Sequence, residues 1–248
     1  MLLNELRDYN ACLLQTDLFK DYCPNGLQVE GRAEVRRIAT GVTASQFVLD
    51  AAIAWGADAI LVHHGYFWRN EDAAITGIKK RRIAKLLHND VSLLAYHLPL
   101  DAHAELGNNA QLGKLLELNT QGRFGEQDIA CIGELAIPQT LAQFAAWIGG
   151  RLQRAPQVVG DGTKRIQKVA WCSGGAQGYF EAAIAQGADA YITGEISEQS
   201  FHLAQESGVA FIAAGHHATE RLGIRALGEH LAAHFGLEHR FFDQDNPV

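Results

Sequence analysis

The fold class follows from one stretch of sequence, Ala57-Asp58-Ala59-Ile60-Leu61-Val62-His63-His64-Gly65. A short apolar run closed by a glycine-containing turn is typical of a buried parallel strand, so His63 and His64 should lie at its carboxyl end. Ligand-binding groups of open α/β sheets collect at that end. Strand side chains alternate between faces, so we expect a loop where both histidines face one site. The alternative is one core histidine bonded to backbone and one solvated histidine.

This strand belongs to a unit of strand, small-residue turn, helix and strand that occurs twice. The copies cover 38–42, 43–45, 47–55 and 57–62, and then 169–172, 173–176, 179–186 and 188–193. Residues 51–59 and 182–190 are identical except where Trp55 aligns with Gln186. The repeated order predicts two pseudo-symmetric α/β domains, which we place at residues 1–122 and 123–248.

Other segments give local expectations. A helix is expected in the first half of residues 1–20, and a short strand after the turn Pro24-Asn25-Gly26. Residues 134–137, 138–152 and 157–159 should form a strand, a helix that starts at Pro138, and a strand. Residues 240–242 should add an edge strand.

Composition predicts a soluble globular protein. The chain has 248 residues, 48% apolar and 20% charged, with a formal net charge of −7. No apolar run reaches the roughly 18 to 20 residues that span a bilayer, and the start lacks a signal peptide's basic flank, so we expect a cytoplasmic protein. The basic run 79–82 is expected to be a solvated helix face, and no general duplex DNA binding is expected. The scattered cysteines should be small buried hydrophobes: Cys12, Cys23, Cys131 and Cys172.

Histidines and carboxylates recur at the predicted strand ends. Two further strands each end in a histidine followed four residues later by a carboxylate. The collected groups are His63, His64, His97, Asp101, His216, His217 and Glu220. His216 and Glu220 should share one face at the start of a helix, whereas Pro99 favours a loop between His97 and Asp101. We expect a metal site in the cleft between the two domains.

These groups exceed what one ion usually takes from protein, so two divalent metal ions are the economical interpretation. Zinc, iron, manganese and nickel all accept such ligands. A metal pair can generate hydroxide and hold a developing anion, which predicts a hydrolase. The chain lacks the nucleophile-elbow, P-loop and dinucleotide-binding motifs.

Three weaker features complete the candidate site. Glu195, at the second-copy equivalent of the histidine pair, could serve as an acid, a base or a group behind a ligand. The turns 43–45 and 173–175 precede helices and could hold a phosphate through backbone N–H groups, or they could be ordinary tight connections. His230 and His234 lack the adjacent glutamate of a zinc-protease helix, so we expect a solvated or helix-end role.

Several motifs together resemble the Nif-three-like dinuclear metal proteins, often labelled GTP cyclohydrolase I type 2 homologues. The motifs are Pro24-Asn25-Gly26-Leu27-Gln28-Val29-Glu30-Gly31, Gly41-Val42-Thr43, Val62-His63-His64-Gly65, His97-Leu98-Pro99-Leu100-Asp101, Thr193-Gly194-Glu195 and Gly215-His216-His217-Ala218-Thr219-Glu220. The resemblance covers nearly the whole chain, in the compact form without an inserted domain.

The resemblance implies two similar α/β domains, two divalent metal ions and a toroidal homohexamer. The implied ligands are His63, His64, Asp101, His216 and Glu220, with Glu220 as the bridge. His97 and His217 then become candidates to orient a ligand or move a proton. The expected function is a metal-dependent hydrolase acting on a small molecule, with a nucleotide as the candidate substrate. The alternative is a metal-binding scaffold or regulator that works through the toroidal oligomer.

Overall fold

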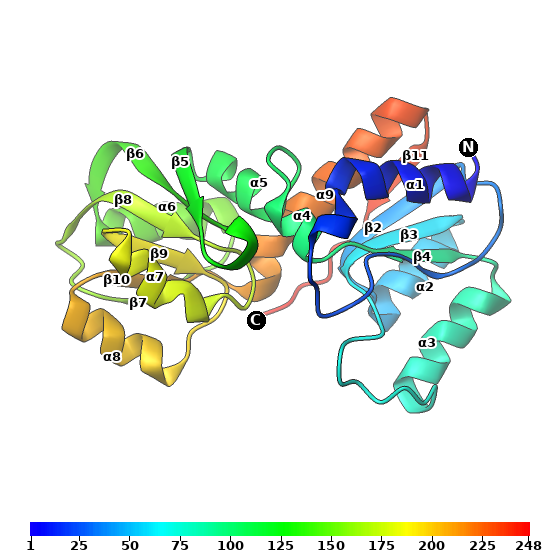
Figure 1. The fold of residues 1–248 in the computed structure, drawn as a ribbon, viewed down its shortest axis with the longest axis horizontal. Helices are drawn as coiled ribbons and strands as arrows, with labels where there is room; N and C mark the ends of the chain where they lie inside the picture. Colours follow the sequence, from blue (N-terminus) through cyan, green and yellow to red (C-terminus); the bar gives the residue numbers. More distant parts are fainter. The chain divides into compact units, whose positions relative to one another are not determined.

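Two β-sheets with helices packed on their faces organise residues 1–248 in the computed structural model (Figure 1). The chain divides into two compact units, the first made of 1–107 and 223–245 and the second of 108–222 and 246–248. Two α/β units were expected, but the bounds differ from 1–122 and 123–248. The long last helix, α9 (His216–Phe235), begins in the second unit and ends in the first.

The first unit contains a five-stranded sheet in the order β1-β4-β3-β2-β11. Its strands are β1 (Gly26–Val29), β2 (Arg37–Thr43), β3 (Ala59–His64), β4 (Ser92–Ala95) and β11 (Glu238–Phe241). Its other elements are α1 (Leu3–Leu14), α2 (Gln46–Trp55), α3 (Gly77–His88) and α4 (Leu98–Ala102). The four strands from β4 to β11 are parallel, and β1 pairs antiparallel with β4. The expected edge strand therefore exists, and it completes the first sheet.

Alternation along the strands of this sheet builds two cores. Leu61 packs with apolar residues of α1 and α9, whereas Ile60 and Val62 pack with residues of α2 and α3. Successive strand side chains point to opposite faces, so both faces need covering helices. The sheet is therefore buried on both sides, with α1 on one face and α2 and α3 on the other (Figure 1).

The second unit contains a six-stranded sheet in the order β5-β6-β8-β9-β10-β7. Its strands are β5 (Leu118–Phe124), β6 (Ala130–Thr140), β7 (Gln157–Val159), β8 (Arg165–Trp171), β9 (Ala190–Thr193) and β10 (Ala210–Ala213). Its helices are α5 (Asn108–Leu115), α6 (Leu141–Leu152), α7 (Phe180–Ala185) and α8 (Glu198–Ser207), besides the start of α9. Only β8, β9 and β10 are parallel to one another.

The helix expected to start at Pro138 starts three residues later. Pro138 lies within β6, and the Thr140 hydroxyl accepts a hydrogen bond from the backbone N–H of Gln143 at 3.3 Å. The Gln143 side chain in turn accepts from the backbone N–H of Thr140, which completes a capping box. The hydroxyl cap satisfies an N–H group at the helix start and so sets the boundary.

The nine-residue repeat has a structural explanation. Gly56 and Gly187 follow α2 and α7 with φ values of +81° and +73°. The next backbone N–H, of Ala57 or Ala188, donates to a carbonyl five residues earlier, closing each helix end. Each repeat thus uses glycine where the backbone must adopt a left-handed conformation.

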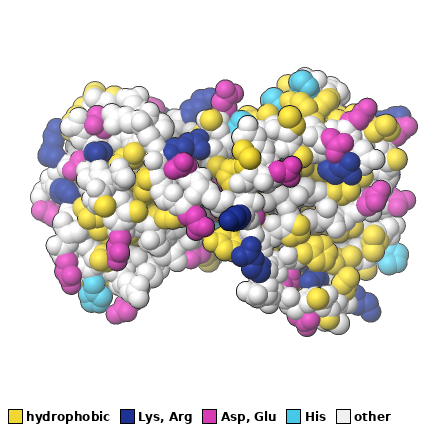
Figure 2. Space-filling model, in the orientation of Figure 1, with side chains coloured by type: hydrophobic (Ala, Val, Ile, Leu, Met, Phe, Trp, Pro, Cys, Tyr) yellow, Lys and Arg dark blue, Asp and Glu magenta, His cyan; other side chains and the backbone are white.

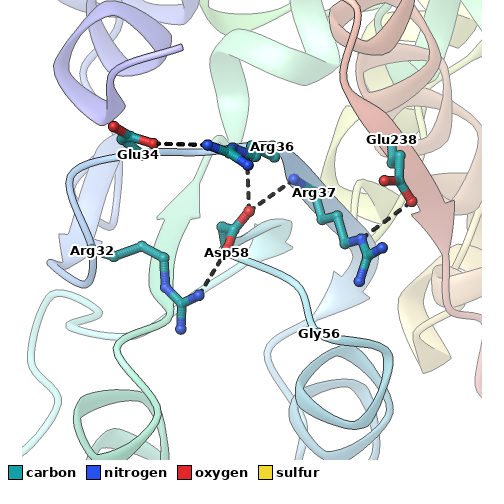
Figure 3. A pocket seen from close by; sticks show the side chains of 7 residues that line it. All are labelled: Arg32, Glu34, Arg36, Arg37, Gly56, Asp58 and Glu238. Atoms are coloured by element: carbon teal, nitrogen blue, oxygen red, sulfur yellow. Dashed lines mark hydrogen bonds and ion pairs between the residues drawn. The ribbon is translucent and has the colours of Figure 1, made fainter.

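The repeated aspartate holds the start of a neighbouring strand. One carboxylate oxygen of Asp58 accepts from the backbone N–H groups of Arg36 and Arg37 at 2.8 and 2.9 Å. The other accepts from Arg32, so that Asp58 is the centre of a hollow lined by paired charges (Figure 3). Asp189 accepts from the N–H groups of Gln167 and Lys168 at 3.0 and 2.9 Å. The two units share this device.

None of the helices combines the length and the apolar character that crossing a bilayer requires. On the face drawn in Figure 2, Lys and Arg side chains are interspersed with Asp and Glu. Three of the four cysteines are buried as expected, but Cys12 is exposed.

Candidate metal centre

Three imidazoles gather at the carboxyl ends of β3 and β4 in the first unit. Ring nitrogens of His63, His64 and His97 lie within 4.8 Å of one another. The ring centroids of His63 and His64 are 4.6 Å apart, and those of His63 and His97 are 5.0 Å apart. The expected loop at the histidine pair is wrong, because β3 continues through His64. Its pairing with β4 stops at Val62, so only β2 pairs with its final residues.

Each ring of the histidine pair is oriented through its Nδ1 atom. His63 is fully buried, and its Nδ1–H donates to the carbonyl oxygen of Tyr96 at 2.9 Å. A carbonyl can only accept, so the lone pair of the neutral ring is on Nε2. His64 Nδ1 lies 3.2 Å from the Thr43 hydroxyl. Such anchoring of one ring nitrogen to an oxygen is typical of histidines that bind metal through the other.

Asp101 adds a carboxylate to this group. It lies in the short helix α4, so the loop predicted from Pro99 is wrong: Pro99 occupies the first turn, where a missing N–H is tolerated. Asp101 is 7% exposed, and its Oδ1 lies 3.6 Å from His63 Nε2. Ligands of an ion with bonds of about 2.0–2.2 Å lie roughly 3 to 3.5 Å apart. The spacing therefore suits two ligands of one ion.

Asp21 is a functional candidate that sequence reasoning missed. Its carboxylate accepts from His97 Nδ1 at 2.7 Å and from the backbone N–H of Leu98 at 2.9 Å. Burial raises the pKa of Asp21, but the hydrogen bond and the charge of His97 lower the pKa by a larger amount, so that the net value is about 2. An ionised aspartate whose side chain is only 3% exposed thus fixes the orientation of His97.

Two residues of the motif after Asp21 have supporting roles. Asn25 accepts from the backbone N–H of His97 at 2.8 Å and donates to Asp21 at 2.9 Å. Gln28 accepts from the backbone N–H of Tyr66 and donates to its carbonyl, at 2.7 and 3.1 Å. The motif therefore holds the segments after β3 and β4. Its turn signal was visible in sequence, but these distant partners were not.

The second unit places a histidine between two carboxylates. At the start of α9, His216 Nε2 lies 3.2 Å from Glu220, and His216 Nδ1 donates to Glu195 at 2.6 Å. Burial alone would lower the pKa of His216, but hydrogen bonds and charge from Glu220 and Glu195 raise it to about 9. The predicted shared face of His216 and Glu220 is confirmed. Glu195 has the geometry of a group that orients His216.

Gly174 leaves space beside this pair. A Cβ atom on Gly174 would meet Glu220 Oε1 and would lie 3.2 Å from His216 Nε2. The residue has a φ of +68°, which disfavours other side chains. The glycine backbone thus lies where a larger residue would crowd the histidine and the carboxylate.

The turns considered for phosphate binding have other partners. The backbone N–H of Gly174 donates to Thr219, and that of Ala176 to Thr193. In the first unit the Ser45 hydroxyl caps α2 by accepting from Val48. These contacts favour ordinary tight connections.

Three other histidines of α9 make contacts outside the two clusters, namely His217, His230 and His234. The backbone N–H of His217 donates to the carbonyl of Val248 at 3.1 Å. His230 Nε2 lies 2.7 Å from the Tyr9 hydroxyl, and His234 stacks on the Tyr9 ring with centroids 4.8 Å apart. The solvated or helix-end role expected for these two histidines is confirmed for His234, which is exposed and lies in the last turn of α9. It is wrong for His230, which is half-buried and packs α9 against α1.

The donor sets in both units fit divalent metal ions. They consist of imidazoles anchored through Nδ1 and of the buried carboxylates Asp101 and Glu220. Imidazole with carboxylate suits zinc, iron, manganese and nickel. The fold and these clusters define a class: two-unit α/β proteins with candidate histidine-carboxylate metal centres.

The chain belongs to the Duf34/NIF3 (NGG1p interacting factor 3) family, whose model matches residues 1–247. This result confirms the resemblance seen in the sequence motifs. A Neisseria meningitidis serogroup B protein called "GTP cyclohydrolase 1 type 2 homolog" is 57% identical over 235 residues, which cover 95% of this chain and 94% of that protein.

Two solved structures support the same assignment. The protein ybgI, described as of unknown function, is 50% identical with a TM-score of 0.97, and the match covers 100% of both chains. TTHA1606 from Thermus thermophilus is 34% identical with a TM-score of 0.92, again over 100% of both chains. This chain thus shares its α/β fold with these two proteins.

Proposed function

We propose that the protein is a divalent-metal-dependent hydrolase that holds two metal ions. The proposed ligands are His63, His64, Asp101, His216 and Glu220, with Glu220 as the bridging carboxylate. Zinc, iron, manganese and nickel are the candidate metals, because all four accept this donor set.

One observation carries the proposal: each unit anchors an imidazole through Nδ1 and places a buried carboxylate near its Nε2. The pairs are His63 with Asp101 at 3.6 Å and His216 with Glu220 at 3.2 Å. Buried carboxylates are costly without a compensating charge, and a cation supplies one. Two divalent metal ions, when bound, supply Lewis acidity and lower the pKa of a bound water molecule.

The chain's own residues have distinct proposed roles. Asp21 holds His97 in a fixed orientation, which suits His97 to accept or deliver a proton. Glu195 orients His216 through its Nδ1. We also retain His217 as a candidate for proton transfer, since it follows His216 at the start of α9.

The proposed substrate is a nucleotide. Support comes from relatives named "GTP cyclohydrolase 1 type 2 homolog", the Neisseria meningitidis protein among them. Hydrolytic opening of a purine ring requires an activated water and a group that moves protons, both of which this site can provide. We further propose assembly into a homohexamer, which light scattering would report as a mass near six times the 27.1 kDa of the chain.

The test is metal-dependent turnover of a nucleotide panel. Protein stripped with chelator and reloaded with Zn²⁺, Mn²⁺, Fe²⁺ or Ni²⁺ is assayed by chromatography, beside the His64→Ala variant. His202→Ala is the matched control, because His202 is an exposed histidine of α8 whose ring nitrogen pairs with Glu198 and which is not one of the proposed ligands. We expect turnover in the wild type and the control, and a loss of at least about a hundredfold in His64→Ala. Metal binding without turnover of any nucleotide would contradict the hydrolase and favour a metal-binding scaffold.

A further inference from the structure

An aromatic wall borders the three-histidine cluster of the first unit. The Trp68 ring meets His97 edge-on, with centroids 5.0 Å apart and planes at 86°, and lies 6.0 Å from the His64 ring. The Tyr22 ring, in the segment before β1, lies 6.4 Å from the His97 ring. Two large aromatic rings therefore flank imidazoles that are candidates for metal binding and proton transfer.

The wall is held in place by backbone contacts. The backbone N–H of Arg69 donates to the carbonyl of Tyr22 at 2.6 Å, and Arg69 Nη2 donates to the carbonyl of Asp21 at 2.7 Å. Trp68 Nε1–H donates to the carbonyl of Gly65 at 3.3 Å. The two Arg69 bonds tie the segment after β3 to the segment that carries Asp21, and the Trp68 bond fixes the indole within its own segment. The rings are thus preorganised, which lowers the entropy cost of binding.

The wall combines exposed aromatic surface with a cation. Tyr22 is 52% exposed, and Trp68 is only partly buried. The Arg69 guanidinium lies 5.7 Å from the centre of the Tyr22 ring, and Arg69 is exposed. Tyrosine, tryptophan and arginine are the residues that stack on nucleobases and pair with phosphate. Simple packing around His97 would not require an exposed tyrosine or a guanidinium.

We propose that Trp68, Tyr22 and Arg69 form the recognition surface for an aromatic heterocycle that carries an anionic group, such as a nucleoside monophosphate. The inference rests on the proposed function, since it names how the same site selects its substrate. Trp68 and Tyr22 contact the planar base, and Arg69 binds the phosphate. Stacking tolerates any base, so this surface selects nucleotides over sugar phosphates.

The test is equilibrium binding of guanosine 5′-monophosphate and of ribose 5-phosphate to metal-loaded full-length protein, measured by calorimetry. Trp68→Ala should weaken nucleotide binding about tenfold or more, because one base stack is worth about that factor or above. The same variant should leave ribose 5-phosphate binding and metal content unchanged. Trp68→Phe should restore most of the affinity.

Three further variants separate stacking from general damage. Tyr22→Ala should weaken binding of the nucleotide but not of ribose 5-phosphate. Arg69→Gln should weaken binding of both phosphate-bearing probes, and it should leave the binding of guanosine, a third probe that has no phosphate, unchanged. Phe201→Ala is the matched control, because Phe201 is an aromatic residue of α8 with 48% exposure. It should change neither affinity.

Two results would overturn the recognition surface. One is equal wild-type affinity for the nucleotide and the sugar phosphate. The other is unchanged nucleotide affinity in both Trp68→Ala and Tyr22→Ala. The proposed function fails separately: selective nucleotide binding without turnover keeps the surface and contradicts the hydrolase, whereas turnover insensitive to Trp68→Ala keeps the hydrolase and contradicts the surface.

Discussion

The two units use the same structural residues around different chemistry. Gly56 and Gly187 end equivalent helices, and Asp58 and Asp189 accept two backbone N–H groups each. At the ends of the equivalent strands β3 and β9, however, the first unit carries two histidines and the second carries Thr193-Gly194-Glu195. The positions that build each fold agree, whereas the positions of the candidate metal ligands differ.

The units also orient a histidine in the same way from different places. In the first unit, His97 Nδ1 donates to Asp21, which lies in the segment before β1. In the second unit, His216 Nδ1 donates to Glu195, which follows β9. The common result is an imidazole fixed by a carboxylate. The segment that supplies the carboxylate differs between the two units.

The largest expected effect tests the shared aspartates. Asp58→Ala should lower the free energy of unfolding by about 3 kcal/mol, and Asp189→Ala by about 2 kcal/mol, since each leaves two N–H groups without an acceptor. The larger loss at Asp58 reflects its lower exposure of 8% and its bond to Arg32. Urea unfolding measures both values. A negligible loss at either position would break the structural equivalence.

A second prediction addresses the space beside Glu220. Gly174→Ala should cost about 2 kcal/mol through its left-handed backbone and should also reduce metal content. Gly208→Ala is the control, because Gly208 has a φ of +70° with no atom within 4 Å of an added Cβ. The control should show strain alone, with metal content unchanged. Equal metal content in both variants would contradict the role given to Gly174.

A third prediction concerns the pH dependence of the Asp21 pair. A carboxyl whose pKa falls from 3.8 to about 2 on folding stabilises the protein above 3.8 and loses that effect as the pH falls toward 2. Asp21→Asn should therefore lower stability by about 2 kcal/mol at pH 7. The gap between variant and wild type should narrow from about pH 4 downward in urea unfolding series. A gap that stays constant with pH would exclude this electrostatic origin.

The smallest expected effect is a shift in the titration of His216. In metal-free protein its pKa is raised from 6.5 to about 9, so its contribution to stability is complete below 6.5 and is lost as the pH rises through 9. Glu195→Gln removes one of the two carboxylates and should lower this pKa toward 6.5. NMR titration of the ring protons measures the change. An unmoved pKa would leave Glu220 as the sole cause.

Sequence predicted the parallel strands and their histidine ends well, because apolar runs, glycine turns and the repeat are local signals. The helix at Asp101 does not follow from the sequence, because a proline usually predicts a helix break, whereas Pro99 lies in the first turn of α4, where it is tolerated. Asp21 was missed because nothing in its neighbours indicates a bond to His97, which is 76 residues away. Contacts between residues that are far apart in the chain can be identified only once the fold is known.

The domain bounds show the same limit. The repeat correctly indicates two units, but α9 begins in the second and ends in the first. Apolar residues of α9, such as Ile224 and Leu227, pack in the first unit's core, which helical periodicity alone cannot assign to either sheet.

The central claim is that the clusters of both units bind metal, and metal content per chain tests it most directly. Mass spectrometry on untagged protein purified without chelator should give about two ions per chain in the wild type. His64→Ala and Glu220→Ala should each lower that value, whereas the exposed controls His202→Ala and Glu198→Ala should not. A content near zero that stays unchanged on adding Zn²⁺, Mn²⁺ or Fe²⁺ would contradict the account.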